Sequence, residues 1–328
     1  MYDKTQLTPG CTIGIFSSSR PITAEYPKAT QCAAQYLRSR GYRVKFGSLT
    51  GKEECVYRSG SILERAREFN DLIHDDSVQC LMASAGGFVS NSILPYLDYE
   101  YLREHPKIIV GHSDITSLLL GIYAQTNIIA YYGPNFITSL SLPEKYASIS
   151  LESLERATCN GLYAYDCPPF YCDTVSWDCT TENAMISCEK TNRYKTVSGG
   201  MCEGRLIGGN LSTLCSLIGS PYMPEIRDGD ILFLEEIGGS PDFCERFYSQ
   251  LALNGIFDKI GGLILGKHKG YDSLGTQYSE IQILLEVLRE RRFPILADFD
   301  CGHTVPILTL PIGRTARMDA DKQRIELL

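Results

Sequence analysis

A serine at the junction of an apolar strand and an apolar helix is the first candidate for chemistry in this chain. Residues 106–124 read PKIIVGHSDITSLLLGIYA, so a buried strand runs into Gly111, His112 and Ser113, and a helix begins at once. A nucleophilic serine on such a turn can use the N–H groups and the dipole of the helix to stabilise negative charge. The same position is also the ordinary place of an N-cap serine. The motif alone leaves both interpretations open.

A nucleophilic serine needs a base and a carboxylate that orients the base. His303 lies in a glycine-bounded loop, DFDCGHTVP, where it either faces a cleft or occupies a surface turn, and His268 follows a strand in LILGKHKG. His112 is a poor base because neighbouring side chains point away from each other in an extended chain. His74 and His105 stand in charged stretches and are expected at the surface. The candidate bases are therefore His303 and His268.

The candidate carboxylates end an apolar strand, GDILFLEE. Alternation with a period of two places Ile231, Phe233 and Glu235 on one face of this strand and Glu236 on the other. Acids at the end of a buried strand are costly unless they reach water or do chemistry. The alternatives are therefore an orienting carboxylate and a simple exit of the strand into solvent.

Backbone donors for an oxyanion are expected at two places. One is the amide of Asp114, the residue after the serine. The other is the pair Gly86-Gly87 in SAGGFVSN, because consecutive glycines let backbone N–H groups approach a ligand closely. An ordinary strand-to-helix turn is the alternative interpretation of the glycine pair.

The elements that must position these residues indicate an α/β protein. Up to residue 140, apolar strands alternate with amphipathic helices, which predicts a parallel sheet with helices on both faces. A helix and a long irregular segment follow, and strands and helices alternate again from about residue 201. We therefore expect an N-terminal α/β domain over 1–140, a connecting helix and loop over 141–200 and a smaller C-terminal α/β domain over 201–328.

Composition excludes several classes of function. A net charge of −8 and a pI near 5.3 argue against nucleic-acid binding, which needs a basic surface. The N-terminus has no signal-peptide pattern, and no apolar run reaches the roughly 18 residues of a membrane span. We expect a cytoplasmic protein that binds no membrane.

Five of the 13 cysteines lie between Cys159 and Cys188, but their irregular spacing, without a nearby histidine, favours neither a metal site nor a disulfide framework.

Several blocks, in order, resemble the LD-carboxypeptidase family of serine peptidases, and within it most closely the microcin C self-immunity branch. The resemblance extends over nearly the whole chain. The blocks are GHSDIT, YYGPN, GRLIGGNLSTL, GDILFLEE, ERFYSQLALNGIFDKIGGLILGKH and DFDCGHTVPILTLPIG.

The resemblance implies a Ser–Glu–His triad on Ser113, Glu235 and His303. It places the oxyanion hole on the amide of Asp114 and on the glycine pair. It also implies a glutamine-amidotransferase-like N-terminal sandwich that carries the serine, a C-terminal domain that supplies the other two residues, a homodimer, and amide hydrolysis with no metal or cofactor.

Three residues bear on the substrate, which the resemblance implies is a small molecule. The microcin branch cleaves aminoacyl-nucleotides and carries a loop tryptophan that stacks on the base, here Trp177; Asn210 matches a substrate-side asparagine. In that branch an acidic residue faces the α-amino group of the substrate. This chain has Lys269 at that position, and a cation there favours binding of a carboxylate or phosphate. The alternatives are a muropeptide LD-carboxypeptidase of peptidoglycan recycling and a catalytically silent small-molecule binder.

Overall fold

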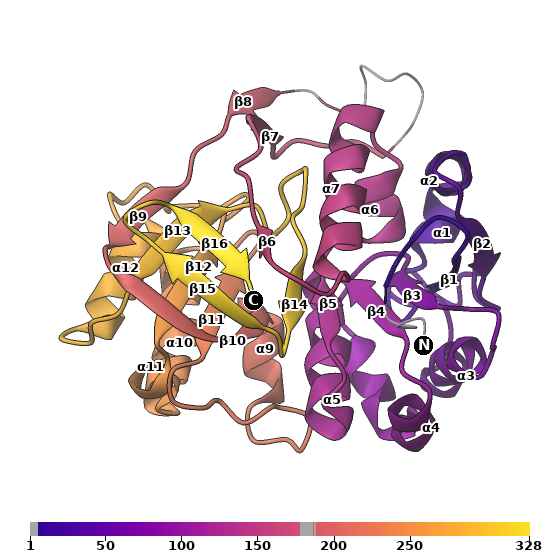
Figure 1. Cartoon of the computed structure of the whole chain (residues 1–328), viewed down its shortest axis with the longest axis horizontal. Coiled ribbons are helices and arrows are strands. Elements are labelled where there is room, and N and C mark those ends of the chain that lie inside the picture. The colour runs from indigo at the N-terminus through magenta and orange to yellow at the C-terminus, as the bar shows by residue number, and fades with distance from the viewer. Residues whose placement is uncertain (1–5, 178–185, 187) are drawn as a thin grey trace.

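The computed structural model describes residues 6–177, 186 and 188–328, and two large sheets dominate it (Figure 1). The five N-terminal strands of the first sheet are parallel, and its sixth strand, from the C-terminal part of the chain, is antiparallel. The order in this sheet is β14 (Leu310–Ile312), β5 (Ala130–Tyr132), β4 (Ile108–Gly111), β3 (Cys80–Ala83), β1 (Thr12–Phe16) and β2 (Arg43–Phe46).

Helices cover both faces of the first sheet, as the alternating pattern predicts. One group packs side by side and lies above the sheet in Figure 1: α1 (Ile22–Glu25), α2 (Pro27–Ser39), α6 (Phe136–Leu140) and α7 (Glu144–Ala157). The other group lies below it: α3 (Ile62–Ile73), η1 (Ser90–Tyr96), α4 (Tyr99–Glu104) and α5 (Thr116–Thr126). The predicted α/β class is confirmed.

The second sheet has eight strands, with a parallel centre from β10 to β13. Its order is β6 (Tyr163–Ala164), β16 (Arg324–Leu327), β15 (Thr315–Asp319), β10 (Met201–Asn210), β11 (Ile231–Glu235), β12 (Gly262–Gly266), β13 (Ile295–Phe299) and β9 (Lys195–Ser198). Its helices are α9 (Leu211–Leu217), α10 (Pro241–Leu253), α11 (Ile256–Lys259) and α12 (Glu280–Leu288). A small antiparallel pair, β7 (Phe170–Cys172) and β8 (Glu189–Thr191), lies in the connecting segment.

Strands cross between the expected domains. β14 leaves the C-terminal part and pairs with β5 in the first sheet, where Leu310 is the register partner of Tyr132. In return, β6 and β9 of the connecting segment pair into the second sheet. One continuous apolar core spans both sheets, so the two halves are held in a fixed relation. The hydrophobic pattern of the sequence does not reveal these exchanges.

Local sequence explains the helices that approach the centre of the molecule. α5 is buried along most of its length, which accounts for its almost continuous apolar sequence, and it ends where Asn127 takes a left-handed conformation with φ of 59°. α3 begins with a capping box between Ser61 and Glu64, and α12 has the same device between Ser279 and Gln282. α5 also packs on α9, which joins the two halves at the serine turn.

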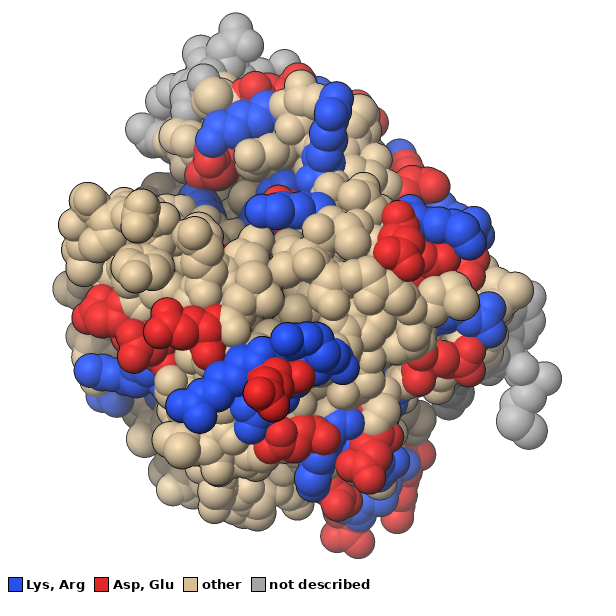
Figure 2. Space-filling view, turned by 90° about the vertical axis from the view of Figure 1, so that its left-hand side faces the viewer, with Lys and Arg blue, Asp and Glu red and all other residues tan. Residues whose placement is uncertain are grey.

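The surface carries mixed charge. On the face shown in Figure 2, basic and acidic side chains are interspersed between large uncharged areas, without a continuous basic field. No helix in the described ranges is long and apolar enough to cross a membrane.

Candidate active site

Ser113 occupies a strained turn at the carboxyl end of β4. Its φ is 65°, a left-handed value that is uncommon for residues other than glycine. The N-cap positions of η2 (Ser113–Ile115) and α5 belong to His112 and Ile115, and neither helix has a side-chain cap. N-cap residues have extended backbone conformations, so Ser113 is not the N-cap serine that its sequence position allows. Strain of this kind concentrates at functional sites.

A chain of hydrogen bonds joins Ser113 to Glu235 and His303. The Ser113 amide donates to the Tyr132 hydroxyl at 3.0 Å, which donates to Glu235 Oε1 at 2.6 Å. Glu235 Oε2 is 2.7 Å from His303 Nδ1. Within the described ranges no hydrogen bond links the Ser113 hydroxyl directly to His303; such bonds often form only when substrate is bound. The structure therefore brings the three expected residues into one network through Tyr132, which sequence reasoning missed.

Glu235 is a buried, charged acceptor. It is 2% exposed and accepts hydrogen bonds from Tyr132, Asn210 and His303. Burial works to raise the pKa of Glu235, but His303 and the Tyr132 hydroxyl outweigh it and lower the pKa. Its neighbour Glu236 is 3% exposed and also fully bonded inside the protein. The two acids therefore do not mark a simple exit of the strand into water.

Asn210 lies beside Glu235 and is buried. Asn210 and Glu235 are register partners on β10 and β11, and Asn210 Nδ2 donates to Glu235 at 3.1 Å and to Glu236 at 2.8 Å. Its Oδ1 accepts from the Thr213 amide at the start of α9. The Asn210 amide donates to Thr116 Oγ1 on the serine helix at 2.9 Å. The polar groups of this side chain are hydrogen-bonded within the protein, where they support Glu235, and the substrate-binding role expected for Asn210 stays a prediction.

Gly86, the first residue of the glycine pair, borders the serine. A Cβ on Gly86 would lie 2.9 Å from Ser113 Cβ and 3.3 Å from the Asp114 amide, so only glycine allows this approach. The Gly86 carbonyl accepts from the Arg20 amide at 3.4 Å. Because the peptide is planar and trans, the N–H of Gly87 points away from Arg20. Gly86 and the Asp114 amide thus lie beside the serine, and the role of Gly86, Gly87 and Asp114 as an oxyanion hole stays a prediction.

The Asp114 side chain holds the glycine loop in place. Its Oδ2 accepts from the amides of Val89 and Ser90, both at 3.0 Å, and from the Ser90 hydroxyl at 2.7 Å. Asp114 is 4% exposed. The carboxylate thereby ties the segment after Gly87 to the serine turn, which fixes the backbone donors before any substrate arrives.

His112 lies inside the site, although the alternation of side chains suggests otherwise. It is 5% exposed, and its ring meets that of His303 edge to face at a centroid distance of 5.5 Å. His112 Nδ1 is 3.0 Å from the Gly133 carbonyl and therefore carries the proton. Burial, together with the positive potential of His303, lowers the pKa of His112 to about 4. His112 is neutral at physiological pH.

We expect His112 to make stability pH-dependent. In the unfolded chain the pKa of a histidine is near 6.5, well above the folded value of about 4. As the pH falls below about 6.5, the unfolded state therefore binds a proton that the folded state does not, and the free energy of unfolding decreases. The contribution is about 2 kcal/mol between pH 8 and pH 5. Urea unfolding of His112→Phe should give a flatter profile than wild type, with His105→Phe as the control for loss of an exposed histidine. An unchanged slope in His112→Phe would contradict this.

His268, the other candidate base, is engaged elsewhere. Its Nε2 is 2.5 Å from the Gly238 carbonyl and its Nδ1 is 3.0 Å from Glu280. Burial alone would lower the pKa of His268, but hydrogen bonds with Cys244 and Glu280 raise it to about 11. A permanently charged imidazole cannot act as a base, so His268 serves to hold the loop around Gly238.

A small cavity adjoins His303 and contains two of the residues expected at the substrate. Its volume is about 60 Å³, and His112, Trp177, Ile237, Lys269 and His303 are among the residues that line it. Trp177 also packs edge to face on Tyr26, with centroids 6.0 Å apart, and within the described ranges its buried indole N–H has no hydrogen-bond partner. Trp177 therefore combines packing with a position at the cavity. Most of the segment that follows it, 178–185 and 187, lies outside the described residues.

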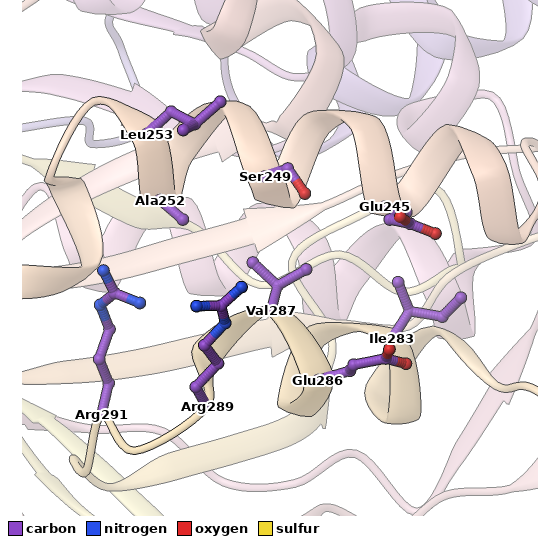
Figure 3. Close-up of a pocket in the computed structure, with 9 residues that line it drawn as sticks. All are labelled: Glu245, Ser249, Ala252, Leu253, Ile283, Glu286, Val287, Arg289 and Arg291. Carbon is purple, nitrogen blue, oxygen red and sulfur yellow. The ribbon is translucent and has the colours of Figure 1, made fainter.

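Larger hollows lie away from this network. A groove of about 460 Å³ runs between α10 and α12, where Ser249 and Ala252 point toward Val287, Arg289 and Arg291 (Figure 3). It contains none of the residues expected to act on a substrate. In the described ranges no group of three His, Cys, Asp or Glu side chains is placed to hold a metal. The 12 cysteines described are free, and Cys179, the thirteenth, lies outside these ranges.

Comparisons with known proteins agree with the fold. The profile of the LD-carboxypeptidase N-terminal domain matches residues 13–133, and that of the LD-carboxypeptidase C-terminal domain matches residues 203–318. The chain belongs to the LD-carboxypeptidase family of serine peptidases, as its sequence blocks predict.

Individual relatives cover almost the whole chain. Microcin C7 self-immunity protein MccF of Escherichia coli is 42% identical over 98% of this chain and 94% of its own length. A solved structure of MccF in complex with glutamyl sulfamoyl guanosine superposes with a TM-score of 0.94, at 41% identity, over 98% of this chain and 97% of that one. A probable murein peptide carboxypeptidase of Bacillus subtilis is 29% identical over 97% of this chain and 92% of its own length.

Proposed function

We propose that this protein is a serine amidohydrolase that cleaves the amide bond of an aminoacyl-nucleotide, in a detoxifying role like that for which the microcin C7 self-immunity relative is named. The observation that carries the proposal is the network from the strained Ser113 through Tyr132 and Glu235 to His303. The relative with 41% identity was solved with an aminoacyl group joined to a nucleoside, which supports the substrate class.

The geometry supports a mechanism through a covalent acyl-enzyme. Because His303 Nδ1 carries a proton and donates a hydrogen bond to Glu235, Nε2 has a free lone pair. That lone pair accepts the proton of Ser113 as the serine oxygen attacks the carbonyl carbon. The amides of Asp114 and of the glycine loop stabilise the oxyanion. His303 then passes the proton to the leaving nitrogen as the C–N bond breaks. Water, activated by the same histidine, hydrolyses the ester and frees Ser113.

The proposal includes where and how the protein acts. An acidic chain with 13 cysteines and no C-x-x-C pair suits the reducing cytoplasm, and the resemblance to the family suits a homodimer. The substrate is a small molecule; nucleic acids and membranes are not expected partners. Light scattering on the purified protein would measure the mass of the assembly.

A paired hydrolysis assay tests this function. One reaction contains an adenosine phosphoramidate N-acylated with an amino acid, and the other a muropeptide tetrapeptide ending in D-alanine, each with wild type, Ser113→Ala and Trp177→Leu. We expect Ser113-dependent release of the amino acid, and a loss of about 5- to 150-fold in kcat/KM for the nucleotide in Trp177→Leu, since stacking on a base contributes about 1–3 kcal/mol.

Two results would overturn the proposed function. Ser113-dependent release of D-alanine alone would make the protein a murein peptide carboxypeptidase, like the Bacillus subtilis relative by its name. Turnover of neither substrate would favour a small-molecule binder without catalysis.

A further inference from the structure

Lys269 stands out among the residues of the cavity beside His303. It is the only Lys, Arg, Asp or Glu that lines this cavity in the described part of the chain. Its side chain is partly buried, and burial lowers its pKa, which shows that the protein does not fully compensate the charge. Within the described ranges no ion pair joins its ammonium to a carboxylate. The charge of Asp173 works to raise the pKa of Lys269, but Asp173 is itself paired with Lys190 at 2.5 Å.

The backbone that carries Lys269 is held firmly. Its carbonyl accepts from the Gly238 amide at 2.8 Å, and it forms a parallel bridge with Ile237, two residues after Glu235. On the other side, the charged His268 is bound to Gly238 and Glu280. The backbone of Lys269 is thus held in place, unlike that of a lysine in a mobile surface loop.

We propose that Lys269 forms the anion-binding end of the substrate site and binds a carboxylate located within one residue of the scissile amide. This inference rests on the proposed function. The cavity is lined by Lys269 and His303 together, and His303 is the residue that protonates the leaving nitrogen, so the two groups act on neighbouring parts of one substrate. Ile237 and Trp177 supply apolar walls, and a volume of about 60 Å³ suits a short stem that ends in a planar carboxylate.

A partly desolvated lysine gains most from an anion. A charge-assisted hydrogen bond is roughly twice as strong as a neutral one. A buried ammonium without a hydrogen-bond partner also bears the full cost of its desolvation, which an anionic ligand offsets. We therefore expect a carboxylate to be favoured over the isosteric amide by about 10- to 100-fold in kcat/KM. The carboxylate can belong to the side chain of the acyl residue or to the C-terminus of a leaving amino acid.

Two pairs of substrates distinguish these sources. Glutamyl and glutaminyl adenosine phosphoramidates differ only in an acyl-side carboxylate; muropeptides that end in D-alanine and in D-alaninamide differ only in a leaving-side carboxylate. Each pair is assayed with wild type, Lys269→Met, Lys269→Glu and the control Lys322→Met, a surface lysine whose side chain is 76% exposed. Thermal unfolding of each variant checks that it is folded.

We expect wild type and Lys322→Met to prefer the acid in one of the two pairs. Lys269→Met should bring that acid-to-amide ratio close to one, and Lys269→Glu should invert it, while Ser113-dependent turnover of the amide member continues. An acid-to-amide ratio that Lys269→Met leaves unchanged, or no acid preference in either pair for wild type, would overturn the inference. If wild type hydrolyses none of the four substrates, the proposed function is refuted instead, so the two failures are distinguishable.

Discussion

Replacing Ser113 with alanine is expected to reduce kcat by about 10⁴- to 10⁶-fold, because the change removes the atom that attacks the carbonyl. The fold should persist, since the amide that donates to Tyr132 remains. The measurement is single-turnover hydrolysis of an aminoacyl adenosine phosphoramidate, combined with circular dichroism. Turnover at the wild-type rate would contradict the assignment of the nucleophile.

A glycine at the same position separates catalysis from strain. With φ of 65°, residue 113 is in a conformation that costs a residue with a Cβ about 1 kcal/mol or more, whereas glycine adopts it freely. We expect Ser113→Gly to be as inactive as Ser113→Ala but more resistant to urea by about 1 kcal/mol. If alanine and glycine variants unfold together, the turn does not store the strain that its backbone indicates.

Replacing Glu235 with glutamine is the second change with a large expected effect. Glutamine keeps an oxygen for Tyr132, but it turns an amide toward His303 Nδ1, which favours the tautomer with the proton on Nε2. That tautomer cannot take the proton of Ser113, so we expect kcat to fall by about 10³- to 10⁴-fold with little change in KM. Steady-state kinetics of the purified variant measures both constants.

Glu236 provides the matched control for this change. It is buried directly after the end of β11 and hydrogen-bonded to Asn210, and in the described part of the chain no hydrogen bond joins it to His303. Glu236→Gln should therefore reduce kcat far less than Glu235→Gln. The reverse ranking would mean that the orienting acid has been assigned to the wrong residue.

The sequence predicts the parallel sheet well because strands buried on both faces must be apolar throughout. β3 and β4 are fully buried, and both read as continuous apolar runs. The crossing of β14 into the first sheet could not be predicted, since Leu310–Ile312 would be equally apolar in either sheet. Which sheet a short apolar strand joins is decided by chain connections and tertiary packing.

Part of the candidate site can be predicted from the sequence, because residue type and position after a strand are visible there and tertiary contacts are not. Ser113, Glu235 and His303 have side chains that bear chemistry, and they follow apolar strands, so their positions in the sequence draw attention. Tyr132 reads as an ordinary core aromatic, and only the pairing of β4 with β5 puts its hydroxyl between Ser113 and Glu235. Alternation along an extended chain predicts that His112 points away from Ser113, but the left-handed turn at residue 113 breaks this alternation.

The most direct test of the central claim is covalent labelling of the intact protein with a fluorophosphonate, followed by mass spectrometry of its peptides. We predict one adduct, on Ser113, which forms in wild type at neutral pH, slows strongly in His303→Ala and is absent from Ser113→Ala. A labelled serine elsewhere, or labelling of Ser113 at the same rate without His303, would contradict the account.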